Sequence, residues 1–159
     1  MAASPKVRRA VAARDKDRCA YCQTSEDNCG LAMHLDHIVP EAAGGESVVG
    51  NLCLACFSCN VAKGAQQAAV DPATGETASL YHPVRQRWTE HFEWSEDDTR
   101  IVGKTPTGRA TVLALKMNNL TVVFARRRWV SAGWHPPPDS RDIAGWEQVT
   151  PADPHSSAD

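Results

Sequence analysis

The chain has 159 residues, enough for one domain with a modest core, and its composition is that of an ordinary globular protein. No apolar run is long enough to span a bilayer, so no membrane partner is expected. The formal net charge of −2 does not by itself indicate a nucleic-acid partner. The charges are segregated, however, and local basic patches are compatible with phosphate binding. Two stretches hold most of the basic residues: Lys6, Arg8, Arg9, Arg14, Lys16 and Arg18, and then Arg126, Arg127 and Arg128.

The first segment predicts a helix from Ser4 to about Arg18, because Ser4 is a good N-cap and Pro5 suits the first helical position. Its alanine and arginine content is also found in mitochondrial transit peptides, but the capped helix explains the segment better. Without a secretory signal the expected compartment is the cytoplasm, where thiols stay reduced. Six cysteines in that compartment indicate metal binding rather than disulfides.

Four cysteines form two matched pairs, whose members are two residues apart: Cys19 with Cys22, and Cys56 with Cys59. This spacing lets both sulfurs of a pair reach one ion, and two pairs supply the four thiolates of a tetrahedral Zn²⁺ site. Such a site is closed, so this metal is expected to be structural. The alternative is that the cysteines are small buried apolar residues, which two matched pairs disfavour. Cys29 and Cys53 lie outside the pairs, and Cys53 is expected in the core.

Between and after the pairs, the pattern predicts strand, loop, strand and helix. The expected elements are a strand over 33–39, a loop over 41–50, a strand over 52–54 and a helix that ends near Gly64. Pro40 stops the first strand. Ser58 is the expected cap of the helix, which carries Asn60 and Lys63.

The second half of the chain predicts a different set of elements, introduced by turn-forming residues at 71–75. They are a hairpin that pairs 92–94 with 100–102, a helix behind a Thr107 cap, and a helix over 120–132 behind an Asn119 cap. The first helix is indicated by the helical spacing of Ala110, Leu113, Ala114 and Met117. The expected fold class is α+β, in three parts: a core over 1–70, an extension over 71–134 and a flexible tail rich in Pro, Ser and Asp over 135–159.

Several motifs of the first half occur in a characteristic order: Cys19-x2-Cys22, Asp36-His37-Ile38-Val39-Pro40, Gly44-Gly45, Asn51-Leu52, and Cys56-x2-Cys59-Asn60-x2-Lys63-Gly64. In this order and spacing they resemble the HNH endonucleases, in the subgroup whose ββα-metal core is braced by a four-cysteine zinc site. The resemblance covers about residues 14–64. Residues 82–137 also look like the extension of small stand-alone bacterial HNH proteins, without roles to transfer.

The resemblance implies hydrolysis of a nucleic-acid phosphodiester bond with one divalent ion. His37 would be the general base that takes a proton from the attacking water, and its basicity suits that task. Asp36 and Asn60 would hold Mg²⁺ or Mn²⁺, and Asn51 would brace the loop that orients His37. One carboxylate and one amide oxygen leave a hard cation open to water and phosphate. The implied products carry a 5′-phosphate and a 3′-hydroxyl.

Simpler roles exist for each of these residues. Neighbours on a regular strand face opposite ways, so Asp36 and His37 can share a site only if the strand end is irregular. His34 lies on the same strand face as Asp36 and is either an additional metal ligand or a structural histidine. Asn60 could be a helix-start residue and Asn51 a turn residue.

The basic residues are candidates for phosphate contacts that do not read sequence: Lys63, Arg8, Arg9, Arg14 and Arg18. The Arg126–Arg128 run fits either phosphate binding or a solvated helix face. The aromatic group Trp88, Phe92 and Trp94 is expected in the core rather than on a base-stacking surface.

The leading hypothesis is a metal-dependent endonuclease that cuts or nicks nucleic acid, which we expect to be DNA, with Mg²⁺ or Mn²⁺. The first alternative is a non-catalytic, zinc-dependent nucleic-acid-binding module, and the second is a scaffold protein with a degenerate site. One active site cuts one strand, so a double-strand break would need two copies or two visits. The sequence shows no clear dimerisation signal.

Overall fold

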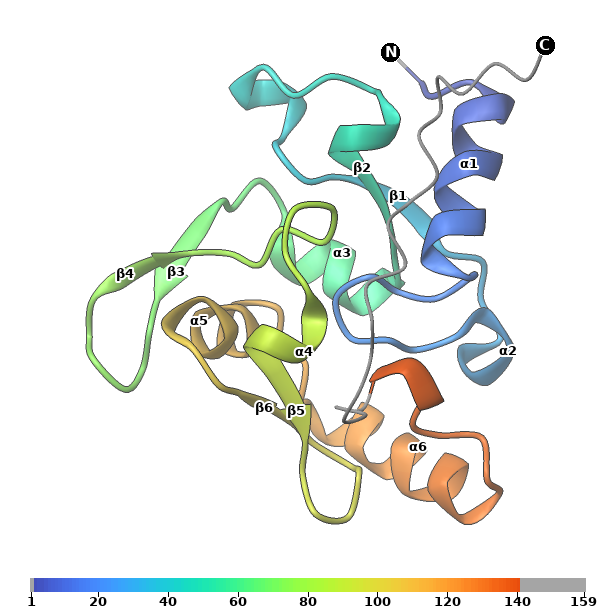
Figure 1. Cartoon of the computed structure of the whole chain (residues 1–159), viewed down its shortest axis with the longest axis vertical. Coiled ribbons are helices and arrows are strands. Elements are labelled where there is room, and N and C mark those ends of the chain that lie inside the picture. Colours follow the sequence, from blue (N-terminus) through green and yellow to red (C-terminus); the bar gives the residue numbers. More distant parts are fainter. Residues whose placement is uncertain (1, 141–159) are drawn as a thin grey trace, which may run out of the picture.

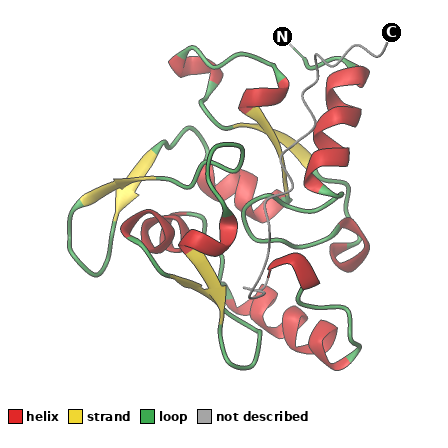
Figure 2. Cartoon of the chain, viewed as in Figure 1, coloured by secondary structure: helices red, strands yellow, loops and turns green. Residues whose placement is uncertain are grey.

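The computed structural model describes residues 2–140, and in this range helices alternate with small antiparallel sheets (Figures 1 and 2). The helices are α1 (Pro5–Asp15), α2 (Glu26–Cys29), α3 (Phe57–Lys63), α4 (Trp88–His91), α5 (Pro106–Ala114) and α6 (Leu120–Ser131). The strands pair as β1 (His34–His37) with β2 (Leu52–Ala55), β3 (Ala68–Val70) with β4 (Thr77–Ser79), and β5 (Phe92–Trp94) with β6 (Ile101–Gly103). Short 3-10 turns are η1 (Glu41–Ala43), η2 (Val49–Asn51) and η3 (Pro138–Ser140). The predicted mixture of helices and small sheets is confirmed.

Helix α1 begins as predicted and packs against β2, but it ends at Asp15 rather than near Arg18, because Lys16 and Asp17 have positive φ. The Ser4 side chain caps its first turn by accepting the Val7 backbone N–H. Val11 is the buried residue of this helix, and the Asp15 carboxylate accepts the backbone N–H of Leu54 at 2.8 Å. The helix is therefore fixed to the sheet both by an apolar contact and by a polar contact.

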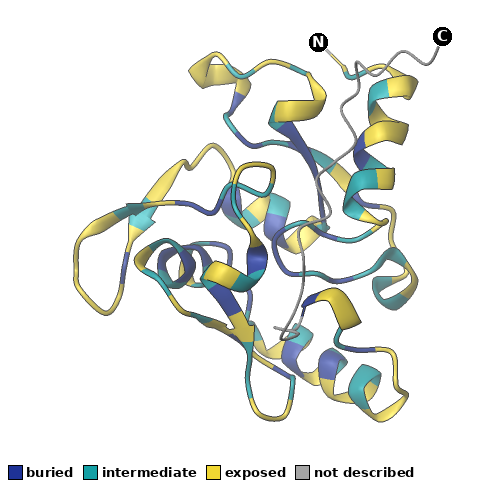
Figure 3. Ribbon diagram, in the orientation of Figure 1, coloured by how far each residue is buried: buried dark blue, intermediate teal, exposed yellow. Residues whose placement is uncertain are grey.

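Strands β1 and β2 pair antiparallel, with His34 opposite Ala55 and His37 opposite Leu52. All of β2 is buried (Figure 3). In β1 the burial differs from residue to residue: His34 is exposed, Asp36 is buried, and Leu35 and His37 are half-buried. Helix α3 follows β2, but the predicted Ser58 cap is wrong. Cys56 is the N-cap, because its sulfur accepts the backbone N–H of Cys59, and Ser58 lies exposed in the first turn.

The turn at 71–75 closes an unpredicted hairpin of β3 and β4, so the expected boundary after residue 70 falls within that hairpin. Asp71 in this turn is completely buried. Arg109 of α5 donates two hydrogen bonds to its carboxylate, both at 2.8 Å. Hydrogen bonding from Arg109 also lowers the pKa of Asp71, so this carboxylate stays charged.

The remaining elements of the extension match most of the prediction. The hairpin of β5 and β6 and the Asn119 cap of α6 are confirmed. The Thr107 cap is wrong, because the Thr105 hydroxyl caps α5 through the Gly108 N–H, with Pro106 at the first helical position. Of the residues at helical spacing, Ala110 is fully buried, whereas Leu113 has 60% of its surface exposed.

A single apolar cluster joins the first and second halves of the described chain. Trp88 and Phe92 are buried in it, which confirms the predicted core role of the aromatic group. The Trp88 indole also donates to the backbone carbonyl of Tyr21 at 2.8 Å. Trp94 packs against Trp88 with ring centroids 5.4 Å apart. None of the helices in residues 2–140 has the length and apolar character needed to cross a membrane.

The part of the predicted tail at residues 135–140 is held against the start of the chain. Asp139 accepts two hydrogen bonds from Arg18, at 2.7 and 2.8 Å, and one from Lys16 at 2.7 Å. The rest of the predicted tail, residues 141–159, lies outside the described residues.

The burial of His135 predicts a pH dependence of stability. Its ring donates to the Asp98 carbonyl at 2.9 Å, and burial lowers the pKa of His135 from 6.5 to about 4. Below pH 6.5 the unfolded chain therefore binds a proton that the folded chain excludes, and folding stability falls. We expect this proton to cost about 2 kcal/mol at pH 5.

Denaturant unfolding at pH 7 and pH 5 measures this effect against a His135→Gln control, which keeps a donor but cannot titrate. The wild type should lose more unfolding free energy than the variant between the two pH values. Equal losses would contradict the prediction.

Candidate functional site

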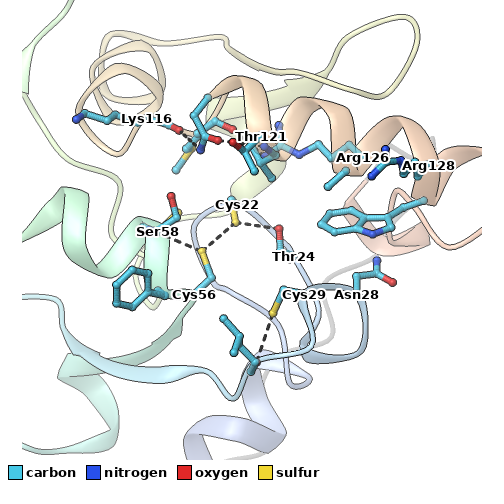
Figure 4. Close-up of a pocket in the computed structure, with 18 of the residues that line it drawn as sticks. Cys22, Thr24, Asn28, Cys29, Cys56, Ser58, Lys116, Thr121, Arg126 and Arg128 are labelled. Atoms are coloured by element: carbon cyan, nitrogen blue, oxygen red, sulfur yellow. Dashed lines mark hydrogen bonds between the residues drawn. The ribbon is translucent and has the colours of Figure 1, made fainter.

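The four paired cysteines come together, as their spacing predicts. The sulfurs of Cys19, Cys22, Cys56 and Cys59 all lie within 4.8 Å of one another. The Cys22 and Cys56 sulfurs are 3.7 Å apart (Figure 4). A tetrahedral zinc ion with Zn–S bonds of about 2.3 Å requires sulfurs about 3.8 Å apart. The cluster is therefore consistent with a zinc site, and its residues fit the ion in type and in spacing.

Each pair is shaped by its own backbone. The Cys22 N–H points at the Cys19 sulfur, and the Cys59 N–H points at the Cys56 sulfur, at 3.5 and 3.4 Å.

Burial raises the pKa of the Cys19 thiol well above its usual value. A divalent cation would reverse that trend, because it stabilises the thiolate form. Within residues 2–140 this is the one group of three or more His, Cys, Asp or Glu side chains spaced for a metal ion.

The two unpaired cysteines lie outside this cluster. Cys53 is fully buried in β2, which confirms its predicted place in the core. Cys29 ends α2 and donates to the carbonyl of Leu31 at 3.3 Å.

Asp36 is buried in a small polar network rather than open to solvent. The Tyr21 hydroxyl donates to its carboxylate at 2.7 Å, and the Lys63 ammonium lies 3.0 Å from the same oxygen. Lys63 also donates to the backbone carbonyl of His37 at 3.0 Å. Burial raises the pKa of Tyr21, so its hydroxyl stays protonated as a donor. The network joins the first cysteine pair, β1 and α3.

Lys63 does not lie where the sequence analysis expected it. It is 2% exposed, and its charge is used within the protein, so a phosphate cannot reach it in this conformation. Sequence reasoning also missed Tyr21, although its position between two zinc-spaced cysteines places it in the same knuckle.

His37 lies at the end of β1 on a half-buried surface and is held by the loop that follows. Its Nε2 is 2.9 Å from the Ser47 hydroxyl and 3.7 Å from a carboxylate oxygen of Glu41. Ser47 gave no sequence signal, because a serine in a glycine-containing loop is unremarkable. The ring is therefore partly accessible and has a defined polar neighbour.

Asn51 closes this loop with its side chain. Its amide oxygen accepts the Val39 N–H, and its amide nitrogen donates to the Val39 and Glu46 carbonyls, at 2.9 to 3.0 Å. A side chain at Gly45 would collide with the Val39 carbonyl, so this position needs glycine. The loop that presents Ser47 to His37 thus has a rigid base.

Asn60 and His34 have fewer contacts. Within the described chain, the Asn60 amide makes no hydrogen bond, and it lies half-buried in the middle of α3. His34 is exposed, and its ring centroid is 6.1 Å from that of Phe57, in the first turn of α3. The face of β1 that carries His34 and Asp36 is thus turned toward α3.

Most of the basic residues proposed for phosphate contacts are engaged inside the protein. Arg8 and Arg9 are exposed, as that role requires, although Arg8 also donates to the Met33 carbonyl. The others bond within the chain: Arg14 to Asp15 and to the Val49 and Leu52 carbonyls, and Arg18 to Asp139.

The Arg126–Arg128 run divides into two kinds of residue. Arg126 is completely buried and donates to the backbone carbonyls of Thr99 and Met117. Arg127 and Arg128 are exposed. Neither reading from sequence foresaw that the first arginine of the run would be a core residue.

The four-cysteine cluster, strands β1 and β2, and helix α3, which Cys56 begins, form a small unit with a histidine at the end of its first strand. Residues 19–66 match the family model described as HNH endonuclease. The chain therefore contains an HNH endonuclease domain, which spans the cysteine cluster, β1, β2 and α3. No curated protein and no solved structure matches the chain.

The cysteine cluster predicts a specific difference between two substitutions. Cys59→Ser should lose the metal and cooperative unfolding, because binding of structural zinc is worth on the order of 10 kcal/mol. Cys29→Ser should keep one zinc ion per chain, because Cys29 is outside the cluster. Elemental analysis and thermal unfolding measure both. Zinc retained by the first variant or lost by the second would contradict the assignment.

The buried pair of Lys63 and Asp36 predicts a coupling in stability. Lys63→Met should cost about 3–5 kcal/mol, because it leaves a buried carboxylate without its counter-charge. Adding Asp36→Asn to this variant should recover part of the loss, because the amide carries no charge. Denaturant unfolding of both single variants and the double variant gives the coupling energy. Strictly additive losses would show that the two side chains do not interact.

Proposed function

We propose that the protein is a metal-dependent endonuclease that hydrolyses phosphodiester bonds in nucleic acid, with DNA the expected substrate. The observation that carries this proposal is a partly accessible His37, held by Ser47 on a braced loop, within an HNH endonuclease domain. We assign β1, β2 and α3 to a ββα-metal core. The extension that follows β2 and α3 would support this core through the shared apolar cluster.

His37 would act as the general base. With the hydrogen on Nε2, the ring donates to the Ser47 hydroxyl and leaves Nδ1 free to accept a proton from water. The water oxygen would form a bond to phosphorus as the bond to the 3′ oxygen breaks, and the leaving 3′ oxygen would take up a proton from solvent. The products would be a 5′-phosphate and a 3′-hydroxyl. Asn51 would keep the loop, and with it Ser47 and His37, in position.

Asp36 and Asn60 would hold the divalent ion, Mg²⁺ or Mn²⁺. A carboxylate has about four lone-pair positions, and Tyr21 and Lys63 occupy most of those on Asp36. This leaves room for a single oxygen contact, while the Asn60 amide oxygen is available. Such a ligand-poor site suits a hard cation that keeps water and phosphate oxygens. When bound, the ion would offset charge on the phosphate and the leaving oxygen.

One observation favours the non-catalytic alternative, a zinc-dependent nucleic-acid-binding module. The Lys63 ammonium already neutralises the Asp36 carboxylate, which weakens its attraction for a cation. A plasmid-nicking assay with and without Mg²⁺ or Mn²⁺ separates the two functions. Binding without metal-dependent nicking would establish the alternative.

Substitution of the proposed base gives the main test. His37→Ala should lower the nicking rate by roughly 10²–10⁴-fold, because general base catalysis contributes about this much. Zinc content and the thermal midpoint should stay at wild-type values, because the side chain is partly exposed.

His34→Ala is the matched control, since it removes an exposed histidine from the same strand. We expect it to retain most of the activity. Undiminished nicking by the His37 variant would exclude that residue as the base. Loss of nicking by the His34 variant would show that His34 contributes directly.

A further inference from the structure

A pocket of about 550 Å³ lies between the four-cysteine cluster and α6 (Figure 4). Its volume is within the range of ordinary small-ligand sites. The side of α6 contributes Thr121, Val122, Arg128 and Trp129, and Lys116 and Met117 lie just before that helix. The opposite side is formed by the cysteine pairs, by the loop after α2, and by Phe57 and Ser58 at the start of α3.

Basic side chains dominate the charged residues of this pocket outside the cysteine cluster. Apart from the cysteines, whose thiolates a zinc ion would hold, its lining contains three basic residues and no aspartate or glutamate, although the whole chain has a net charge of −2. Arg126 is buried and bonded to carbonyls beside the thiol cluster. Lys116 and Arg128 are exposed, so their charges can reach an anionic ligand. The pocket is therefore complementary to a negatively charged partner.

The walls are largely apolar and include two aromatic rings. Trp129 is half-buried, and the Phe57 ring is 61% exposed. The hydroxyls of Ser58 and Thr121 make no hydrogen bond to any residue that the structure describes. An apolar pocket with aromatic faces, free hydroxyls and cations at its edge matches the chemistry of a nucleobase and its flanking phosphates.

The pocket shares helix α3 with the proposed nuclease site. Phe57 and Ser58 line the pocket, and Asn60 and Lys63 follow on the same helix. The Phe57 ring contacts His34, which is three residues before His37 on β1. Three strand residues span about 10 Å, so a strand of nucleic acid could reach both places within a few nucleotides.

We propose that this pocket binds an unpaired nucleobase of the nucleic-acid strand, stacked on Trp129, with neighbouring phosphates at Lys116 and Arg128. The inference rests on the nucleic-acid binding in the proposed function and adds a preference for single-stranded or locally unpaired substrate. Cleavage is not part of it, so it is tested by binding alone.

The first experiment measures binding of a fluorescently labelled single strand and of its duplex to the full chain without added Mg²⁺ or Mn²⁺. Trp129→Leu should weaken binding to the single strand by about tenfold, the expected loss of one base stack. Trp134→Leu is the matched control, because Trp134 is 66% exposed and does not line the pocket. We expect it to change binding by less than about twofold.

Thr121→Glu gives a second variant that keeps the fold. Residue 121 is in the first turn of α6, behind the Asn119 cap, where an acidic side chain favours the helix. It also places a carboxylate in a lining that has no aspartate or glutamate. Binding of the single strand should fall by about tenfold or more while the thermal midpoint is maintained or raised.

The salt dependence tests the phosphate contacts. Replacing Lys116 and Arg128 together by Gln should reduce the slope of log K against log salt by about 1.4, since each lost contact removes about 0.7 for a single strand. Arg127→Gln is the control, because Arg127 lies over the Phe124 ring outside the pocket. It should leave most of the slope unchanged.

The outcomes distinguish this inference from the proposed nuclease activity. Weaker binding by the pocket variants supports the inference even if the wild type never nicks DNA. Equal binding by the Trp129 and Trp134 variants overturns it even if the wild type nicks efficiently. Variants that change self-association instead of binding would also overturn it, because the pocket would then be an interface between copies.

Discussion

Two Cys-x-x-Cys turns meet where the Cys22 and Cys56 sulfurs are 3.7 Å apart, although 34 positions separate them in sequence. Metal binding at this point would close a loop that contains β1, the braced turn and β2. The free energy of a structural zinc ion is large enough to offset the entropy of closing such a loop. The same cluster starts α3, because Cys56 is also its N-cap. The four-cysteine cluster therefore determines the relative positions of β1 and α3. Any cation site shared by these two elements depends on those positions.

A second constraint acts at the other end of α3. The Lys63 ammonium contacts both the Asp36 carboxylate and the His37 carbonyl, while Tyr21 reaches the same carboxylate from the first cysteine pair. A buried ion pair is a weak source of stability, but it permits few alternative geometries. Thiolates at the start of α3 and an ion pair at its end would together fix the helix along β1. Asn60 lies between these two points.

Local signals in the sequence were sufficient for much of this architecture. Cysteine spacing located the cluster, and Ser4 and Asn119 located two helix starts. The pattern of residues 92–102 located the hairpin of β5 and β6. The burial and pairing of the basic residues could not be predicted in the same way. Arg18 pairs with an aspartate 121 positions later, and Lys63 and Arg126 are buried by elements remote in sequence. Charge patterns report how many cations a segment has, whereas tertiary packing determines which of them solvent can reach.

The HNH match ends at residue 66, but the physical unit extends beyond it. The Trp88 indole bonds to the Tyr21 carbonyl within the first cysteine pair, and Phe92 and Met117 belong to the same apolar cluster as β2. A fragment limited to residues 19–66 would expose this apolar surface and lose α1, whose Asp15 holds the Leu54 backbone. It would also lack helix α6, which forms one wall of the pocket beside the four-cysteine cluster. The extension is therefore both a cover for the domain and one side of its proposed nucleobase site, so a change in its packing would affect stability and substrate binding together.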